Sequence, residues 1–357
     1  MKDILIFCPS IEYGGVEKNL YIISNYFSRK IKKNRISIIT ANNNQKKNFS
    51  KTIKFFSPKK DFNNSSRLTK IIVSIILFLN NFRDKDIVIL SFQANIAAIL
   101  LAKIFKKKII IRSNTAPEKF ANNIFRKIFF GFFFKFADKI VVNSLIFKKQ
   151  MKKLLNLNSI CIYNSIENKK IKKSKDNFFN DRYLKIITIG RLTDQKDHLT
   201  LLKALKLVVK KVNAKLMIVG KGKNLSILKN FVEENMLKRY VKFFGYTNNT
   251  DSLLKSSDLF ILSSRYEGLP NVLIEAQSLN VPIISSDCQT GPKEILLSER
   301  LGELFPVGNF KILSDKILNF TRNKKRYLDK SKLAKKFLFR FNLEKNCSKY
   351  LDTIRGF

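Results

Sequence analysis

Two glutamates, Glu267 and Glu275, are the residues whose type and spacing most clearly suggest chemistry. They lie eight positions apart in the segment RYEGLPNVLIE, residues 265–275. The apolar run 258–264 before it predicts a buried strand, and 271–280 has the spacing of a helix. Carboxylates accept hydrogen bonds from sugar and ribose hydroxyls, and the N-terminus of a helix favours an anion. The segment therefore predicts a nucleotide-sugar site.

The turn between that strand and that helix consists of Gly268, Leu269, Pro270 and Asn271. Glycine and proline are typical of turns. The turn places Glu267 at the carboxyl end of a strand, where open α/β sheets bind their ligands. We therefore expect these four residues to line the site, with Glu275 further along the helix.

Two cations follow the first strand of the second half of the chain. Arg191 comes directly after the strand-like run 184–190, and Lys196 follows five residues later. Arginine can bind a diphosphate through two hydrogen bonds, and lysine supplies a point charge. Because basic residues are common in this chain, the assignment depends on the two glutamates lying in the same half.

Glycines follow two other predicted strands. Gly14 and Gly15 open a helix after the first strand, and Gly220 ends a later strand in the sequence GKG. Glycine lets backbone N–H groups approach a phosphate, but an ordinary tight turn explains these positions equally well. The first pair is not the GxGxxG fingerprint, so a dinucleotide-dependent dehydrogenase is disfavoured.

Strands and helices alternate along the chain, which predicts an α/β fold with parallel sheets. The expected strands are 4–8, 35–40, 87–91, 108–113 and 139–144, then 184–190, 214–220, 241–245, 258–264 and 281–286. The polar segment 169–183 suits a linker. We therefore expect two Rossmann-like domains, residues 1–168 and 184–330, followed by a helical segment, residues 331–357.

The formal net charge is +42, from 69 Lys and Arg against 27 Asp and Glu. One interpretation is a compositional bias spread over a solvated surface. The other is an anionic partner, namely a diphosphate substrate, an acidic membrane surface or nucleic acid. A hydrophobic content of 45% indicates a globular protein.

The cysteines and the apolar segments indicate in which cellular compartment the protein is expected. Cys8, Cys161, Cys288 and Cys347 are far apart, which favours reduced thiols in a cytoplasmic protein. The N-terminus reads as a strand and not as a secretory signal. The longest apolar segment, 71–82, is shorter than a membrane span and suits a core helix.

Few residues of this sequence could support a histidine-based or a metal-based mechanism. His198 is the only histidine, and we expect it at the start of a helix, facing solvent or the linker, in a structural role. Asp84 and Asp86 have a DxD spacing but precede a strand, so we expect a turn there. We expect no metal and no cofactor.

Residues 124–136, IFRKIFFGFFFKF, combine aromatic and basic side chains. A buried core helix is one explanation. The alternative is a helix lying on an anionic membrane, where each nearby Lys or Arg contributes roughly 1 kcal/mol.

Taken together, these motifs resemble those of the family 4 glycosyltransferases over most of the chain. The resemblance is carried by 190–205 (GRLTDQKDHLTLLKAL), by 265–296 with its E-x7-E pattern, and by 162–167 (IYNSIE). It implies the GT-B fold, two Rossmann-like domains facing across a cleft, with the C-terminal helix packing back on the first domain. It also implies a retaining enzyme that needs no metal and binds its donor mainly on the second domain.

The resemblance assigns roles in the second domain. Glu267 would bind the donor sugar and stabilise an oxocarbenium-like transition state, and Glu275 would bind the ribose. Arg191 and Lys196 would neutralise the diphosphate.

In the first domain, Gly15 would approach the diphosphate. Arg112 stands where many relatives have a histidine and is expected on the acceptor side.

We therefore expect transfer of a hexose or N-acetylhexosamine from a nucleotide sugar, chiefly a UDP-sugar, to a glycan or lipid-linked acceptor. Such an enzyme of bacterial surface polysaccharide synthesis would be cytoplasmic and peripheral to the inner face of the plasma membrane. The alternatives are a non-hydrolysing UDP-sugar 2-epimerase and a basic nucleic-acid-binding protein. The second lacks a recognisable binding module, so we expect no nucleic-acid partner.

Overall fold

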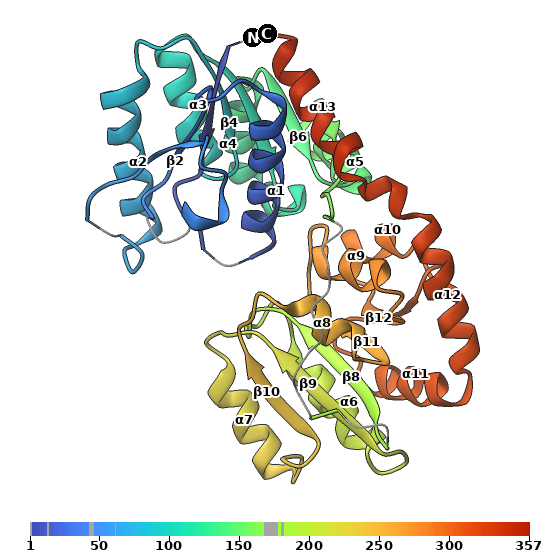
Figure 1. Ribbon diagram of the computed structural model, residues 1–357. Helices are drawn as coiled ribbons and strands as arrows, with labels where there is room; N and C mark the ends of the chain where they lie inside the picture. The colour runs from blue at the N-terminus through green and yellow to red at the C-terminus, as the bar shows by residue number, and fades with distance from the viewer. Residues whose placement is uncertain (1, 13, 43–45, 61, 168–177, 180–181) are drawn as a thin grey trace. The chain divides into compact units, whose positions relative to one another are not determined.

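The structure, a computed structural model, describes residues 2–12, 14–42, 46–60, 62–167, 178–179 and 182–357. It contains two compact units (Figure 1). Unit 1 comprises residues 1–167 and 341–357, and unit 2 comprises residues 168–340. Each contains a parallel sheet with helices packed against it, which confirms the expected α/β class with two Rossmann-like halves.

The sheet of unit 1 has seven parallel strands in the order β3-β2-β1-β4-β5-β6-β7. They are β1 (Asp3–Phe7), β2 (Ile36–Ile39), β3 (Lys54–Phe56), β4 (Ile87–Ser91), β5 (Lys108–Ser113), β6 (Lys139–Val142) and β7 (Ile160–Cys161). The helices are α1 (Gly15–Lys30), α2 (Arg67–Phe82), α3 (Asn95–Ile104), α4 (Ile124–Lys135), α5 (Leu145–Leu155) and α13 (Leu343–Arg355).

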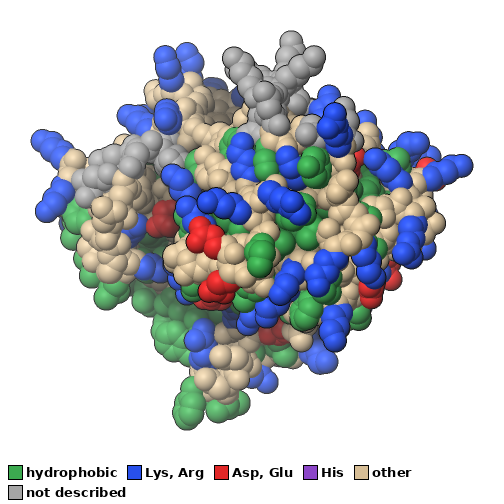
Figure 2. Space-filling view, turned by 90° about the horizontal axis from the view of Figure 1, so that it is seen from below, with side chains coloured by type: hydrophobic (Ala, Val, Ile, Leu, Met, Phe, Trp, Pro, Cys, Tyr) green, Lys and Arg blue, Asp and Glu red, His purple; other side chains and the backbone are tan. Residues whose placement is uncertain are grey.

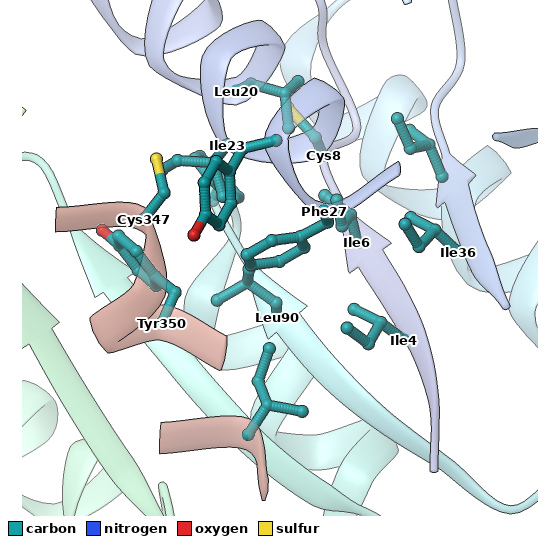
Figure 3. Close-up of a cluster of buried hydrophobic side chains, with 14 of the residues drawn as sticks. Ile4, Ile6, Cys8, Leu20, Ile23, Phe27, Ile36, Leu90, Cys347 and Tyr350 are labelled. Carbon is teal, nitrogen blue, oxygen red and sulfur yellow. The ribbon is translucent and has the colours of Figure 1, made fainter. Parts of the chain in front are cut away.

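Side chains of β1 alternate between two cores. Ile4 and Ile6 lie in a cluster with residues of α1 and α13, and Figure 3 shows Phe27 of α1 between them and Tyr350 and Cys347 of α13. Leu5 points to the opposite cluster, which residues of α2, α3, α4 and α5 cover. Successive strand residues face opposite sides, so a continuous apolar run is what a strand buried on both faces requires.

The sheet of unit 2 has six parallel strands in the order β10-β9-β8-β11-β12-β13. They are β8 (Leu184–Ile189), β9 (Ala214–Val219), β10 (Val241–Gly245), β11 (Leu259–Leu262), β12 (Ile283–Ser286) and β13 (Glu303–Phe305). The helices are α6 (His198–Val208), α7 (Leu225–Glu234), α8 (Thr250–Lys255), α9 (Asn271–Ser278), α10 (Gly291–Ile295), α11 (Phe310–Arg322) and α12 (Lys324–Lys336). Residues of α6, α7 and α11 pack with the strands in one core.

Several expectations about elements need correction. The ten expected strands are present, but β3, β7 and β13 were not expected, and each has only two or three residues. The expected helical segment 331–357 is two helices, because Asn342 caps a new one by accepting the Lys345 N–H at 2.9 Å. Of the expected linker, 169–177 and 180–181 lie outside the described residues.

The apolar segment 71–82 forms part of α2, which is a surface helix and not a core helix. Its buried positions are Lys70, Ser74, Phe78 and Phe82, whereas Ile72 and Ile76 are exposed. Over the described part of the chain, no helix combines the length and the apolar character that crossing a bilayer requires.

Candidate active site at the carboxyl ends of the strands

The strand order of unit 2 reverses between β8 and β11. The chain continues from β8 to β9 on one side, whereas β11 and β12 extend the sheet on the other side. The loops after β8 and β11 therefore diverge, and open α/β sheets bind ligands in the crevice that such loops leave. Arg191 and Lys196 follow β8, and Glu267 follows β11, so the fold brings three expected site residues to one edge.

The carboxylate of Glu267 is held by two donors from these loops. Lys196 Nζ donates to Glu267 Oε1 at 2.5 Å, and Ser264 Oγ donates to the same oxygen at 2.6 Å. The side chains of Glu267 and Lys196 are 7% and 15% exposed. Within the described residues, Glu267 Oε2 receives no hydrogen bond. One oxygen thus fixes the carboxylate, and the other is available to a hydroxyl.

Backbone and amide contacts join the same two loops. The Arg265 N–H donates to the Gln195 carbonyl at 2.8 Å, and Gln195 Nε2 donates to the Tyr266 carbonyl at 3.0 Å. Ser263 Oγ donates to the Lys196 carbonyl at 3.0 Å. These three hydrogen bonds fix the position of the loop that carries Lys196 relative to the loop that carries Glu267.

Glycines allow the loops to pack closely. A Cβ on Gly220 would lie 1.9 Å from the Gly190 carbonyl oxygen, and Gly220 has a φ of +147°. A Cβ on Gly291 would lie 1.7 Å from the Gly268 carbonyl oxygen. Other residues do not fit at Gly220 and Gly291 unless the backbone moves. Gly220 therefore packs against the loop that carries Arg191, and Gly268 against the start of α10.

Arg191 differs from Lys196 in its surroundings. Its side chain is exposed, and no residue in the described part of the chain pairs with it. An exposed guanidinium beside a strand end can bind an incoming anion without first breaking an ion pair.

Helix α9 begins at Asn271 with Pro270 as its N-cap residue and no side-chain cap hydrogen bond. Leu269 is buried in the preceding turn. Glu275 is half-buried one turn into the helix. The turn 268–271 and Glu275 thus lie on the segment that leads away from Glu267, as the sequence indicated.

Burial perturbs two titratable groups near this edge. His198 is 3% exposed at the start of α6, so the expectation that it faces solvent or linker is wrong. Its burial and the nearby Lys196 charge lower the pKa of His198 to about 3. Burial and the Glu267 charge raise the pKa of Cys288 to about 12. Near neutral pH both groups are uncharged, so neither supplies a charge to the site.

The glycine loop of unit 1 follows β1, at the position where that sheet also reverses its order. Gly14 is the N-cap residue of α1 and has an extended backbone, and α1 begins at Gly15. A Cβ on Gly14 would lie 2.8 Å from Glu17 Oε2. Glu17 is buried, and its Oε1 accepts a hydrogen bond from Gln93 Nε2 at 3.3 Å. The helix end therefore already has a carboxylate beside it.

Arg112 lies in the interior of unit 1, and not at the surface where an acceptor contact would place it. Its Nε donates to Tyr350 Oη at 2.9 Å, its Nη2 to Asn164 Oδ1 at 2.6 Å, and its Nη1 to Asn114. The guanidinium also lies over the Phe92 ring. All three nitrogens bind protein groups, so the geometry favours a structural role that joins β5 to α13.

Sequence reasoning missed several residues that build this edge. Ser264 donates to the Glu267 carboxylate, and Thr290 Oγ1 donates to the Glu267 carbonyl. Asp197 accepts from Arg265 Nε at 3.3 Å and from Thr200 at 2.9 Å. The run DQKD, residues 194–197, was a signal for Asp197. Nothing local in the sequence pointed to Thr290.

A family model described as glycosyl transferases group 1 matches residues 147–337. An uncharacterized glycosyltransferase of Methanocaldococcus jannaschii is 35% identical over 256 residues, which are 65% of this chain and 63% of the relative. The aligned segment therefore spans just under two thirds of that relative's length.

A Campylobacter jejuni relative is 27% identical over 270 residues, 71% of this chain and 72% of the relative. Its name is N-acetylgalactosamine-N,N'-diacetylbacillosaminyl-diphospho-undecaprenol 4-alpha-N-acetylgalactosaminyltransferase. Among solved structures, HepE of Anabaena in complex with UDP and glucose has a TM-score of 0.83 at 16% identity, over 100% of both chains. That likeness is one of fold.

Proposed function

Because this chain belongs to the glycosyl transferases group 1 and has the GT-B fold, we propose that it transfers a sugar from a nucleotide donor. The donor class we propose is a UDP-hexose or UDP-N-acetylhexosamine. The acceptor is a glycan or a lipid-linked glycan of bacterial surface polysaccharide synthesis. The reaction retains the anomeric configuration and needs no metal, as in the family 4 glycosyltransferases that the motifs resemble.

The main support is the arrangement around Glu267. Its Oε1 is fixed by Lys196 and Ser264 at the point where the sheet order of unit 2 reverses. A fixed carboxylate with a second oxygen open to hydroxyls is suited to binding the donor sugar and to stabilising positive charge at its anomeric carbon.

Arg191 and Lys196 would stabilise the diphosphate as it departs. In transfer, the acceptor oxygen forms a bond to the anomeric carbon, and the bond from that carbon to the diphosphate oxygen breaks. The electron pair of the broken bond leaves with UDP, and the acceptor hydroxyl proton passes to the departing phosphate on the same face. Cations close to those oxygens favour the transition state, because negative charge develops there.

Other assignments complete the proposal. Glu275 on α9 would bind the ribose hydroxyls, beside the backbone of 268–271 and Gly220. Gly14 and Gly15 would let the backbone of unit 1 approach a phosphate, with Glu17 restricting how much negative charge that helix end accepts.

The choice of donor and acceptor rests on the comparisons. The Anabaena structure contains UDP and glucose, and the Campylobacter relative is named for an undecaprenol-linked acceptor. UDP-sugars are therefore the first donors to test, and a lipid-linked diphosphate sugar is the first acceptor. An enzyme with that acceptor would work on the cytoplasmic side of the membrane as a peripheral protein.

A donor screen tests the proposal directly. UDP-, GDP- and ADP-sugars are added to the full chain, and thermal unfolding is followed, because a ligand of the folded state raises the apparent stability. The donor that stabilises most is then incubated with a lipid-linked acceptor analogue. We expect stabilisation by a UDP-sugar and a product with the donor's anomeric configuration by NMR. Epimerised sugar without transfer would favour the epimerase, and inverted product would exclude retention.

A further inference from the structure

Helix α4 exposes most of its apolar side chains. Phe125 is 81% exposed, Ile128 63% and Phe132 56%, and they follow one another at the three- or four-residue spacing of a single helix face. Only Gly131 and Phe134 of this helix are buried. The interpretation of 124–136 as a core helix is therefore wrong for most of its length.

The first two turns of helix α2 have an inverted pattern, whereas Phe78 and Phe82 further along are buried in the core. Its buried face carries Lys70 and Ser74 in the two turns where its exposed face carries Leu68, Ile72 and Ile76. Lys70 Nζ binds the exposed Glu12 carboxylate at 3.0 Å, so a buried, ion-paired lysine occupies this face. Surface helices usually turn their apolar residues inward. Apolar residues that point outward beside a polar inner face indicate a surface that contacts something else.

Helix α3 connects the two apolar faces. It packs against both α2 and α4, and its Leu100 and Ile104 are exposed. All three helices cover the same side of the unit 1 sheet. We call the exposed side chains of these helices the α2–α4 face; its apolar members are Leu68, Ile72, Ile76, Leu79, Leu100, Ile104, Ile124, Phe125, Ile128, Phe129 and Phe132.

Basic side chains accompany this face. Between residues 95 and 136 the sequence has nine Lys or Arg and one acidic residue, Glu118. Of the nine, Arg112 is buried, and Lys103 and Lys108 pair with Asp138. Arg126, Lys127 and Lys135 of α4 are exposed among the phenylalanines. Figure 2 shows Lys and Arg spread over the side of the molecule in view, with few acidic side chains among them. Basic side chains are thus spread over the surface, whereas α4 combines them with exposed aromatic rings.

We propose that the α2–α4 face docks on an anionic lipid surface, with Phe125 and Phe132 inserted among the acyl chains and Arg126 and Lys127 on the headgroups. Aromatic and aliphatic side chains flanked by Lys and Arg are the composition of helices that lie in a membrane interface. A second copy of this chain is a poorer occupant, because it would set like charges against each other. This docking face rests on the proposed function, because a lipid-linked acceptor lies in the membrane and the enzyme must reach it there.

Tryptophan fluorescence gives a direct test, because the sequence has no tryptophan. Full-length Phe125→Trp and, as a matched control, Ile227→Trp on α7 of unit 2 are mixed with vesicles of phosphatidylcholine, with and without phosphatidylglycerol. Ile227 is also an exposed apolar residue, 58% against 81% for Phe125. We expect a blue shift of the Phe125→Trp emission with anionic vesicles only, and none for Ile227→Trp. A shift in both variants, or in neither, would overturn the proposal.

Vesicle sedimentation distinguishes binding through the α2–α4 face from binding through the positive charge of the whole protein. The test variants are Phe125→Ser with Phe132→Ser, and Arg126→Glu with Lys127→Glu. The control is Lys229→Glu with Lys325→Glu, two exposed lysines of unit 2. We expect each test variant to bind anionic vesicles at least tenfold more weakly than the wild type, and the control to stay within about twofold. Equal losses in test and control variants would contradict the proposal, as would a wild-type dimer in light scattering that the Phe125 variant abolishes.

The same proteins are assayed with a water-soluble acceptor analogue and no vesicles. Wild type and both α4 variants should then transfer sugar equally, because this face is outside the candidate active site. Absence of transfer in every protein would count against the proposed function and leave the vesicle result standing. Unchanged transfer together with vesicle binding that is independent of α4 would overturn only the docking surface.

Discussion

Lys196 Nζ lies 2.5 Å from Glu267 Oε1, although the two residues are 71 positions apart in the sequence. One follows β8 and the other follows β11, the two strands between which the sheet order of unit 2 reverses. A cation and a carboxylate are thus paired at the point of the fold where a ligand is expected. The pair orients the carboxylate before any donor arrives.

Removing one partner of this pair should destabilise unit 2. Lys196→Met leaves the buried Glu267 carboxylate without its cation, and the loss should be about 3 kcal/mol in the free energy of unfolding. Glu267→Gln in the same chain should restore part of that loss, because no charge then remains buried. Urea unfolding of the two single variants and the double variant measures the coupling. Strict additivity would show that the pair does not stabilise the fold.

Arg191→Ala should reduce transfer without reducing stability. The side chain is exposed and unpaired within the described residues. A charged hydrogen bond contributes roughly 1.5–3 kcal/mol, so the loss should be about ten- to a hundredfold in rate. Steady-state kinetics with a UDP-sugar measures it, and Lys229→Ala on α7 is the control. Equal rates for the two variants would remove Arg191 from the site.

Gly291→Ala should destabilise unit 2 and disturb the turn that follows Glu267. The added Cβ would lie 1.7 Å from the Gly268 carbonyl oxygen, so the turn that carries Leu269 and Pro270 must move. We expect a loss of about 1–3 kcal/mol in stability and a weaker response to donor in thermal unfolding. Gly356→Ala, where the nearest atoms lie at 3.7 Å, should be close to neutral. A neutral Gly291→Ala would show that the turn is not packed as described.

His198 should make stability depend on pH. Its pKa is about 3 in the folded chain and about 6.5 in an unfolded one. Between these values the unfolded chain binds a proton that the folded chain does not, so stability falls as pH falls. Between pH 7 and pH 5 the wild type should lose about 2 kcal/mol more than His198→Met.

Urea unfolding at the two pH values measures the effect of His198. Carboxylates with a lowered pKa, such as Asp138 and Glu303, are present in both proteins, so their contribution cancels in the difference. Identical pH dependence in wild type and His198→Met would mean that the imidazole is accessible to protons in the folded state.

Arg112→Met should destabilise unit 1 and leave donor binding unchanged. The substitution removes the donor from three buried or half-buried oxygen atoms, those of Tyr350, Asn164 and Asn114. Each unsatisfied buried group costs about 1–3 kcal/mol, so we expect a loss of about 3 kcal/mol or more. Arg83→Met, at an exposed residue whose ion pair is with the neighbouring Asp84, should change little. A stable Arg112→Met variant with lost acceptor turnover would restore the acceptor-side role.

The sequence was sufficient for the central strands and for the residues at their ends. β1 and β4 are apolar except for one end residue, and β8 is apolar except for Lys185 and Thr188. Strands buried on both faces are expected to be largely apolar, so the positions after them could be predicted. Short edge strands such as β3 and β13 have too few residues to show a period. Pairings across long sequence separations, such as Lys196 with Glu267, depend on strand order, which one sequence does not encode locally.

The burial of individual side chains also could not be predicted from local sequence patterns. Arg112 and His198 are polar residues in apolar surroundings, and both were expected at accessible positions. Arg112 is covered by α13, which lies more than 200 residues later in the chain. Conversely, the exposed phenylalanines of α4 resemble core residues in the sequence, and only the fold places them outside.

The most direct test is the rate of sugar transfer from a UDP-sugar by Glu267→Gln, compared with wild type. Glutamine keeps the size of the side chain and removes its charge, so it can no longer stabilise positive charge at the anomeric carbon. We predict a fall of a hundredfold or more in kcat, with UDP still raising the unfolding temperature as it does for wild type. A Glu267→Gln protein that transfers sugar at the wild-type rate would contradict the account.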